Sequence, residues 1–162
     1  MKTLSKTLAV LWTSAFLTNT LVGGAGTLPL GNGTLPLRLD GDAQHDVDET
    51  TRTLALSLRL TKAVPDSQEQ PKVTCQALGA GASRIQVQGT LRLGSQVLTL
   101  VSACVSGDSV EFVAKNGGTS GVLVGRVVNS LELGDKVLGR LTISVNSTQA
   151  SRYSVNLSTA DQ

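Results

Sequence analysis

Between residues 53 and 61 the chain alternates between leucine and smaller or more polar residues. The leucines are Leu54, Leu56, Leu58 and Leu60. A period of two puts alternate side chains on opposite faces of a β-strand, so this segment is predicted to be a strand with one buried face. The same alternation returns at intervals almost to the C-terminus. The chain is therefore predicted to consist of strands that bury one side each.

Further alternating or apolar segments are separated by short clusters rich in glycine, and no segment outside the N-terminus has helical spacing. Many short strands with glycine-rich turns favour an all-β fold, which we expect to be an antiparallel β-sandwich of about 7–9 strands, with a barrel as the alternative. An immunoglobulin-like architecture is the commonest such sandwich. Residues 26–162 contain no Trp to pack on a disulfide, so we infer an architecture and no family.

The dipeptide Gly94-Ser95 predicts a two-residue type II′ hairpin, because glycine is favoured at the first central position of that turn. In this register Leu93 faces Gln96, Leu91 faces Leu98, and Gly89 faces Leu100. Even spacing would put Cys104 on the same apolar face as Leu100. Val73, Cys75 and Ala77 form another every-second set, which predicts a strand. The two cysteines are therefore expected on core-facing sides of strands.

The N-terminus has the three-part layout of a secretory signal. Lys2 and Lys6 form a basic start, residues 8–17 an apolar centre, and residues 21–26 a run of mostly small residues. We expect cleavage after Ala25 and localisation in the periplasm, at the cell surface or outside the cell. The apolar centre is shorter than the roughly 20 residues that a membrane-spanning helix needs. Cys75 and Cys104, an even pair in an exported chain, predict a disulfide.

Removal of residues 1–25 leaves an extended segment with an acidic loop, 26–49, and a main domain, 50–162. Pro29 and Pro36 exclude central strand positions, because proline lacks a backbone donor. Leu35, Leu37 and Leu39 still alternate. They predict an edge strand with Arg38 turned outward.

Composition excludes several classes of function. The net charge of +2 derives from the leader lysines, so the processed chain is nearly neutral and has no basic field for nucleic acid. Phe112 and Tyr153 are the aromatic residues that remain, too few for a stacking platform. Arg84, Arg92, Arg126, Arg140 and Arg152 fall at outward positions or strand ends. We interpret most of them as charges that protect strand edges from pairing with other chains.

Catalytic and metal motifs are scarce. The single histidine, His45, would have to carry any Ser-His-Asp or zinc site. No catalytic residue and no cofactor is predicted. The acidic loop allows one weak metal hypothesis, because clustered carboxylates are the oxygen ligands that calcium prefers. The candidate ligands are Asp40, Asp42, Asp46, Asp48 and Glu49. The alternative interpretation is a solvated acidic turn.

We therefore expect a non-enzymatic exported domain that acts by contact with a protein, and self-association remains open. A second hypothesis is a structural subunit of a surface fibre, in which the segment 26–39 completes the sheet of a neighbour. A small secreted hydrolase or redox enzyme is the third. A redox dithiol is normally CxxC, whereas these cysteines are 29 positions apart.

Overall fold

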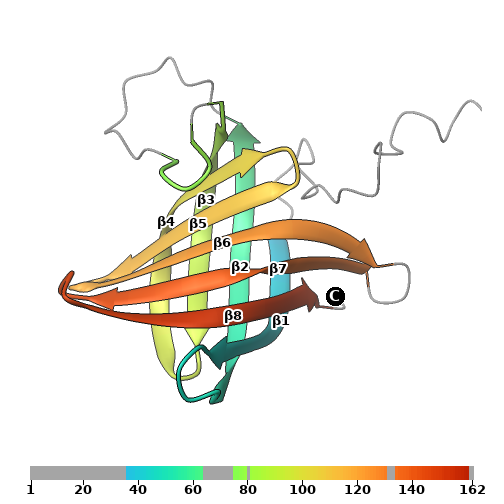
Figure 1. Ribbon diagram of the computed structural model, residues 1–162. Coiled ribbons are helices and arrows are strands. Elements are labelled where there is room, and N and C mark those ends of the chain that lie inside the picture. The colour runs from blue at the N-terminus through green and yellow to red at the C-terminus, as the bar shows by residue number, and fades with distance from the viewer. Residues whose placement is uncertain (1–35, 64–74, 80, 131–133, 161–162) are drawn as a thin grey trace, which may run out of the picture.

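The protein is a closed antiparallel β-barrel (Figure 1). A computed structural model describes residues 36–63, 75–79, 81–130 and 134–160. Each strand pairs with the next, and the first pairs with the last. The strands are β1 (Pro36–His45), β2 (Thr51–Ala63), β3 (Ser83–Leu93), β4 (Gln96–Ser106), β5 (Ser109–Asn116), β6 (Thr119–Ser130), β7 (Gly134–Val145) and β8 (Gln149–Thr159). The all-β antiparallel class is confirmed, and the architecture is the barrel alternative rather than the sandwich.

Strand direction turns steadily around the ring. In Figure 1, β6, β7 and β8 run nearly horizontally in front of the more upright β2 and β3. Two walls therefore face each other across the core, as in a sandwich. The walls belong to one continuous sheet, because β4 and β5 join them on one side and the β8–β1 pair joins them on the other.

Tight hairpins fix the order of the strands. Gly94, Gly107 and Gly117 each stand first in a two-residue turn and have φ angles of 58°, 59° and 56°. Positive φ at this position belongs to type II′ turns, and glycine adopts it without steric penalty. The predicted hairpin at Gly94-Ser95 is confirmed, with Leu93 opposite Gln96 and Leu91 opposite Leu98.

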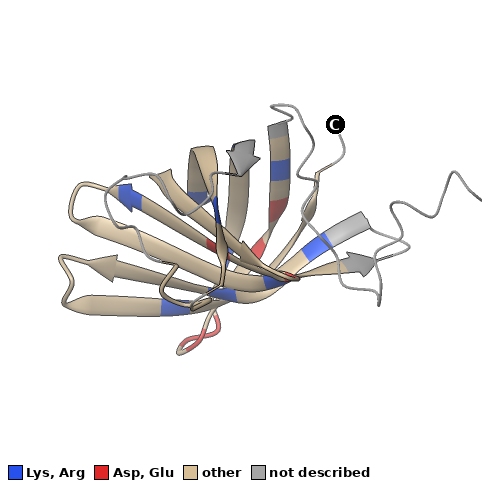
Figure 2. Cartoon of the chain, turned by 90° about the horizontal axis from the view of Figure 1, so that it is seen from above, with Lys and Arg blue, Asp and Glu red and all other residues tan. Residues whose placement is uncertain are grey.

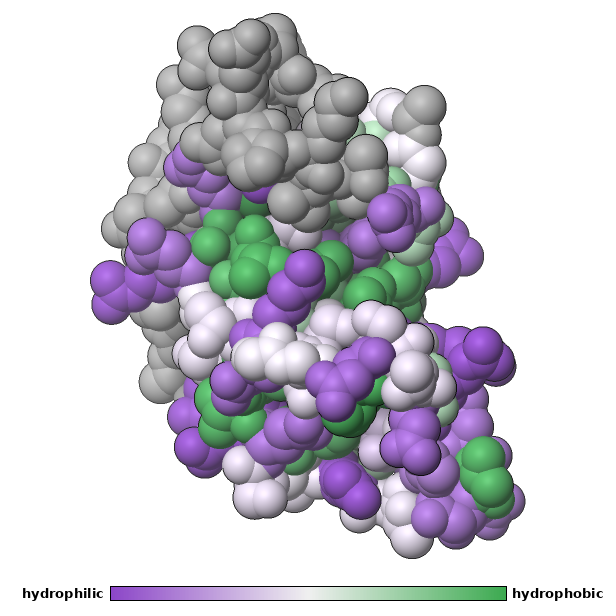
Figure 3. All heavy atoms as spheres, turned by 90° about the vertical axis from the view of Figure 1, so that its left-hand side faces the viewer, coloured by the Kyte–Doolittle hydropathy of each residue, from purple (hydrophilic) through white to green (hydrophobic). Residues whose placement is uncertain are grey.

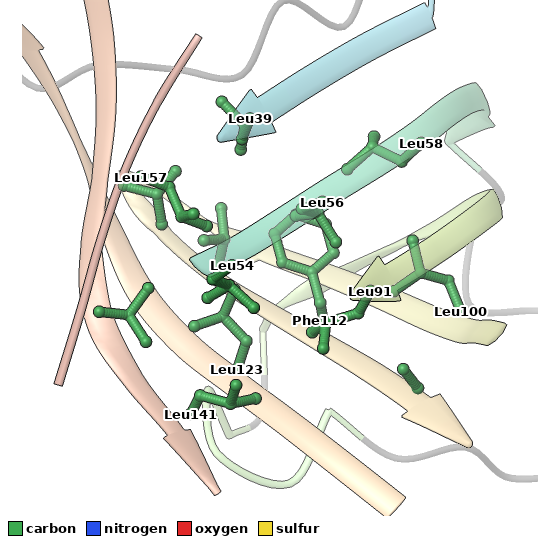
Figure 4. Packing of buried hydrophobic residues seen from close by; sticks show 14 of the residues in the cluster. Leu39, Leu54, Leu56, Leu58, Leu91, Leu100, Phe112, Leu123, Leu141 and Leu157 are labelled. Carbon is green, nitrogen blue, oxygen red and sulfur yellow. The ribbon is translucent and has the colours of Figure 1, made fainter. Parts of the chain in front are cut away.

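The barrel interior is packed with apolar side chains from all eight strands. Figure 4 shows leucines from facing walls pointing toward one another around Phe112. Leu56, Phe112, Leu123 and Leu141 are completely inaccessible to solvent. The predicted alternation of Leu54, Leu56 and Leu58 is confirmed, because all three are buried. Of the residues beside them, Thr53, Ser57 and Arg59 are exposed and Ala55 is half-buried.

The segment expected to be an edge strand is instead a full member of the ring. β1 pairs with β2 on one side and with β8 on the other. Leu39 is buried and Arg38 exposed, as the alternation predicted. Residues 40–45, expected within the acidic loop, continue this strand, and the loop begins at Asp46. The predicted leader, residues 1–25, lies outside the described residues.

A β-bulge in β4 overturns the predicted orientation of Cys104. Leu100 pairs with Ala114 and Ser102 with Val113, so Val101 is the extra residue. A bulge reverses the inside–outside parity of all that follows. Ala103 therefore faces the core, and Cys104 lies opposite Glu111 on the outer wall. A separate irregularity, in which β3 has the extra residue, removes the predicted Gly89–Leu100 pair, because the β3–β4 register shifts between Ile85 and Thr90.

Two local predictions near turns also need correction. Cys75 lies in a turn rather than in a strand, and Val73 lies outside the described residues. Gly134 and Asp135, a dipeptide typical of turns, are instead the first residues of β7. β3 begins only at Ser83, so the alternation that includes Cys75 and Ala77 did not mark a strand there.

Glycine is required at position 41, where β1 approaches the backbone of its neighbour β8 closely. A Cβ atom built at Gly41 would lie 2.0 Å from the carbonyl oxygen of Asn156, a backbone atom that cannot move away independently. We expect Gly41→Ala to lower the free energy of unfolding by about 1–3 kcal/mol, as overpacking does elsewhere. Urea unfolding would measure it. Ser57→Ala on the outer face of β2 is the control and should change stability by less than about 0.5 kcal/mol. Equal stability of the two variants would contradict this close approach.

Candidate functional site

A cluster of polar groups closes one end of the barrel at the β1–β2 loop. His45 ends β1 opposite Tyr153, and the centroids of the two rings are 5.1 Å apart. Tyr153 is buried, and the guanidinium carbon of Arg52 lies 6.0 Å from the centre of its ring. The tyrosine therefore points into the barrel, and the imidazole and the guanidinium lie near its ring.

Asp48 organises this loop. Its Oδ1 atom lies 2.7 Å from His45 Nδ1 and accepts hydrogen bonds from Thr50 Oγ1 at 2.7 Å and Thr50 N at 3.1 Å. The Thr50 bonds, followed by the contact with His45, lower the pKa of Asp48 from 3.8 to about 2. The carboxylate thus holds the loop in a turn, and Glu49 adopts a left-handed φ of 57° within it.

The neighbouring carboxylate binds a different strand. Asp46 N donates to the carbonyl of Arg152, and Asp46 Oδ1 accepts from Ser154 Oγ at 3.2 Å. The loop is therefore fastened to β8 as well as to its own strands. Figure 2 shows the acidic residues of this loop as a red turn at the lower edge of the barrel.

The structure does not gather the five calcium candidates. Asp40 pairs with Arg38 at 2.8 Å, and Asp42 lies exposed on the outer wall. Asp46 and Asp48 bond separate groups, and Glu49 is exposed. Among the described residues, no group of three or more His, Cys, Asp or Glu is placed to hold a metal ion.

His45 has the geometry of an oriented imidazole without a nucleophile beside it. Its carboxylate partner is Asp48, and its other contact is the ring of Tyr153. Among the described residues, no hydroxyl or thiol forms a hydrogen bond with the His45 ring. The contacts of the His45 ring therefore link the end of β1 to its own loop and to β8.

A second polar site lies on the outer wall, under the turn formed by residues 75–79. The Sγ atoms of Cys75 and Cys104 are 2.05 Å apart, the distance of a disulfide bond. Glu111 is only 3% exposed, and its Oε2 accepts a 3.0 Å hydrogen bond from Ala77 N. A covalent bond and a buried hydrogen bond therefore hold the same turn against β4 and β5, outside the barrel rather than in its core.

Sequence reasoning missed this role of Glu111 and also an ion pair at the same end of the β4–β5 hairpin. Arg126 Nε lies 3.0 Å from Asp108 Oδ2, and hydrogen bonding from this guanidinium lowers the pKa of Asp108. The pairing of Ser109 with Arg126 brings the β4–β5 turn beside β6. A hairpin register through Gly117-Gly118 could have suggested this proximity. No sequence signal pointed to the Glu111 hydrogen bond.

The outer wall of β6 and β7 has a different character. Val128 and Leu138 are 38% and 43% exposed, and they lie on neighbouring strands in adjacent rows of the sheet. Val122 and Val124, also facing outward on β6, are half-buried. Arg126 and Arg140 stand among them. Figure 3 shows that, on the side it presents, apolar surface occurs in patches separated by polar side chains.

No family model matches the chain, and no curated protein or solved structure matches it either. A membrane-crossing helix of sufficient length and hydropathy is not found within the described residues. The functional assignment therefore depends on the chemistry of the site alone.

The disulfide between Cys75 and Cys104, which we call the clamp, leads to a prediction about stability. A bridge that spans 29 positions should stabilise the fold by about 3–4 kcal/mol on the chain-entropy model. We expect the double variant Cys75→Ser/Cys104→Ser to lose that amount in urea unfolding. Reduced wild-type protein should behave like the variant. An unchanged unfolding midpoint in both would show that the clamp does not contribute to stability.

The Asp48 hydrogen bonds predict a dependence of stability on pH. Because the folded carboxyl has the lower pKa, its ionised form stabilises the fold above about pH 4, and this contribution is lost as the pH falls toward 2. Asp48→Asn should be less stable at neutral pH and lose less stability between pH 4 and 2. Thermal unfolding followed by circular dichroism would measure this. Glu49→Gln, which removes an exposed carboxylate of the same loop that takes part in none of the ion pairs of the described residues, is the control. The proposal fails if Asp48→Asn retains the full pH dependence of the wild type.

Proposed function

We propose that this is an exported, non-enzymatic barrel that acts by binding a protein through the outer wall of β6 and β7. It would work in the periplasm, at the cell surface or in the extracellular space. The observation that carries the proposal is the filled interior, because tightly packed apolar side chains from all eight strands occupy it. Recognition then falls to the outer wall and the loops.

The composition of the β6–β7 wall supports this choice of surface. Exposed apolar side chains interspersed with arginine are typical of protein interfaces, in which lysine and acidic residues are depleted at the centre. Val128 and Leu138 supply exposed apolar area, and Arg126 and Arg140 stand next to Leu138. Exposed valines elsewhere stand singly, at the β1–β2 loop, at the β4 bulge and at the end of β7.

Two features support export. The N-terminal residues have the layout of a signal peptide. The cysteine pair at disulfide distance suits an oxidising compartment. The predicted cleavage would release the chain from residue 26 onward, ten residues before β1 begins.

The fibre hypothesis has less support from the architecture. Strand complementation needs an open sheet edge that accepts a foreign strand. Each of the eight described strands is already paired on both sides. A donor strand would have to displace a resident one and break its ladder of hydrogen bonds.

Site-specific photo-crosslinking tests the proposed contact surface. A photoreactive amino acid replaces Leu138 in the full-length chain expressed in its native host, and Ser57 on the outer wall of β2 is the control position. We expect a discrete adduct with a protein from position 138 and none from position 57. Leu138→Asp with the photoreactive group at Val128 should remove the adduct. Equal labelling from both positions, or none from position 138, would reject this surface, and chain retained in the cytosol would reject export.

A further inference from the structure

The outward residues of β7, β8 and β1 form a regular grid of three columns and three rows. Register aligns Lys136 with Ser158 and Asp40, Leu138 with Asn156 and Asp42, and Arg140 with Ser154 and Gln44. All nine side chains lie on the outer wall, exposed or half-buried. We call this surface the β8 face. It adjoins the β6–β7 wall and shares Leu138 and Arg140 with it.

Charge is sorted by column on the β8 face. The β7 column has the cations Lys136 and Arg140, and the β1 column has the anions Asp40 and Asp42. The β8 column between them is uncharged and short. Neighbouring strands are about 4.8 Å apart, so the two charged columns are separated by roughly 10 Å.

These charges are mostly without opposite partners inside the protein. Among the described residues, the ion pairs are Arg38–Asp40, His45–Asp48 and Arg126–Asp108. Lys136, Arg140 and Asp42 take part in none of them. Asp42 and Arg140 are exposed, so two opposite charges are available to a molecule that lies across the face.

We propose that the β8 face binds a second copy of this chain about a two-fold axis that runs along β8. The proposal rests on the proposed function, and it names a partner for the part of the β6–β7 wall that the β8 face shares, Leu138 and Arg140. A rotation about that axis brings β7 of one copy over β1 of the other and keeps each residue in its row. The cationic column then faces the anionic column twice, once on each side of β8.

The register places Asp42, the carboxylate without an ion pair, at the centre of the contact. Asp42 of the second copy comes opposite Leu138, with Lys136 and Arg140 one row away on either side. Outward residues of one strand are about 7 Å apart, within reach of the long lysine and arginine side chains. The short Ser154, Asn156 and Ser158 of each copy meet at the axis and allow close approach. Leu138, 43% exposed in the monomer, is covered.

The alternative two-fold axis, which runs across the strands, is excluded by charge. It would place β7 over β7 and β1 over β1, so that Lys136 would meet Arg140, and Asp42 would meet Asp42 of the second copy. Like charges in contact oppose association. The same columns that attract in one orientation therefore repel in the other.

Sedimentation of the purified exported protein, combined with charge reversal, tests this contact. We expect a dimer whose dissociation constant rises at least tenfold between low and high salt, because the facing charges are screened. Asp42→Lys should weaken association at least tenfold, and so should Lys136→Asp/Arg140→Asp. Because residue 136 lies in the row of Asp40, which is unchanged, the triple variant that combines them should recover only part of the association, yet associate more tightly than either parent variant. Arg59→Asp, a reversal on the outer wall of β2, should have no effect.

The result separates this inference from the proposed function. A monomer at all concentrations, or a triple variant no tighter than its parents, would overturn the dimer. If position 138 then still crosslinks to a different protein, the binding function stands with another partner. A crosslinked product of twice the chain mass would support both, provided that the parent variants lose it and the triple variant regains it.

Discussion

The pairing of β1 with β8 is the constraint on which the rest of the structure depends. It joins seven residue pairs from Leu39–Thr159 to His45–Tyr153 and turns a meander into a ring. An open eight-stranded meander would leave two edges with unpaired backbone groups and one uncovered apolar face. Closure removes both problems at once, because β1 and β8 each gain a second neighbour and the apolar faces cover one another. The close approach of Gly41 to Asn156 follows from the same junction.

Much of the fold was predictable from local patterns. The alternation of leucines fixed which residues of β2 are buried, and Gly94-Ser95 fixed the register of β3 against β4. Ring closure was not predictable in the same way, since it joins residues about 120 positions apart and alternation is the same in a sandwich. Some connections did hold a signal: two-residue turns join β3 to β4, β4 to β5 and β5 to β6, whereas a Greek-key sandwich needs long crossovers. The connection from β2 to β3, residues 64–82, holds no such signal.

The bulge at Val101 shows why parity arguments fail beyond one strand. Nothing in the residues from 96 to 106 distinguishes a regular strand from one with an extra residue, because Val101 is as suited to a strand as its neighbours. One inserted position moved Cys104 from the core to the outer wall. It also placed the cysteine opposite Glu111, so the disulfide and the buried carboxylate hold the same turn. The predicted pairing of Cys75 with Cys104 survived, although its predicted location did not.

The candidate site was harder to predict because its contacts come from distant segments. Asp46 and Asp48 are close in sequence, yet one bonds Ser154 on β8 and the other His45 and Thr50 in its own loop. Counting carboxylates in a loop cannot reveal that hydrogen bonds within the protein already engage them. The columns of charge on β7 and β1 are equally invisible in sequence, since a neutral strand separates them and only ring closure brings β1 beside β8. Closure that removes the sheet edges therefore also creates the outer surface on which opposite charges lie in register. In a barrel with a filled interior, that surface is where specificity has to be built.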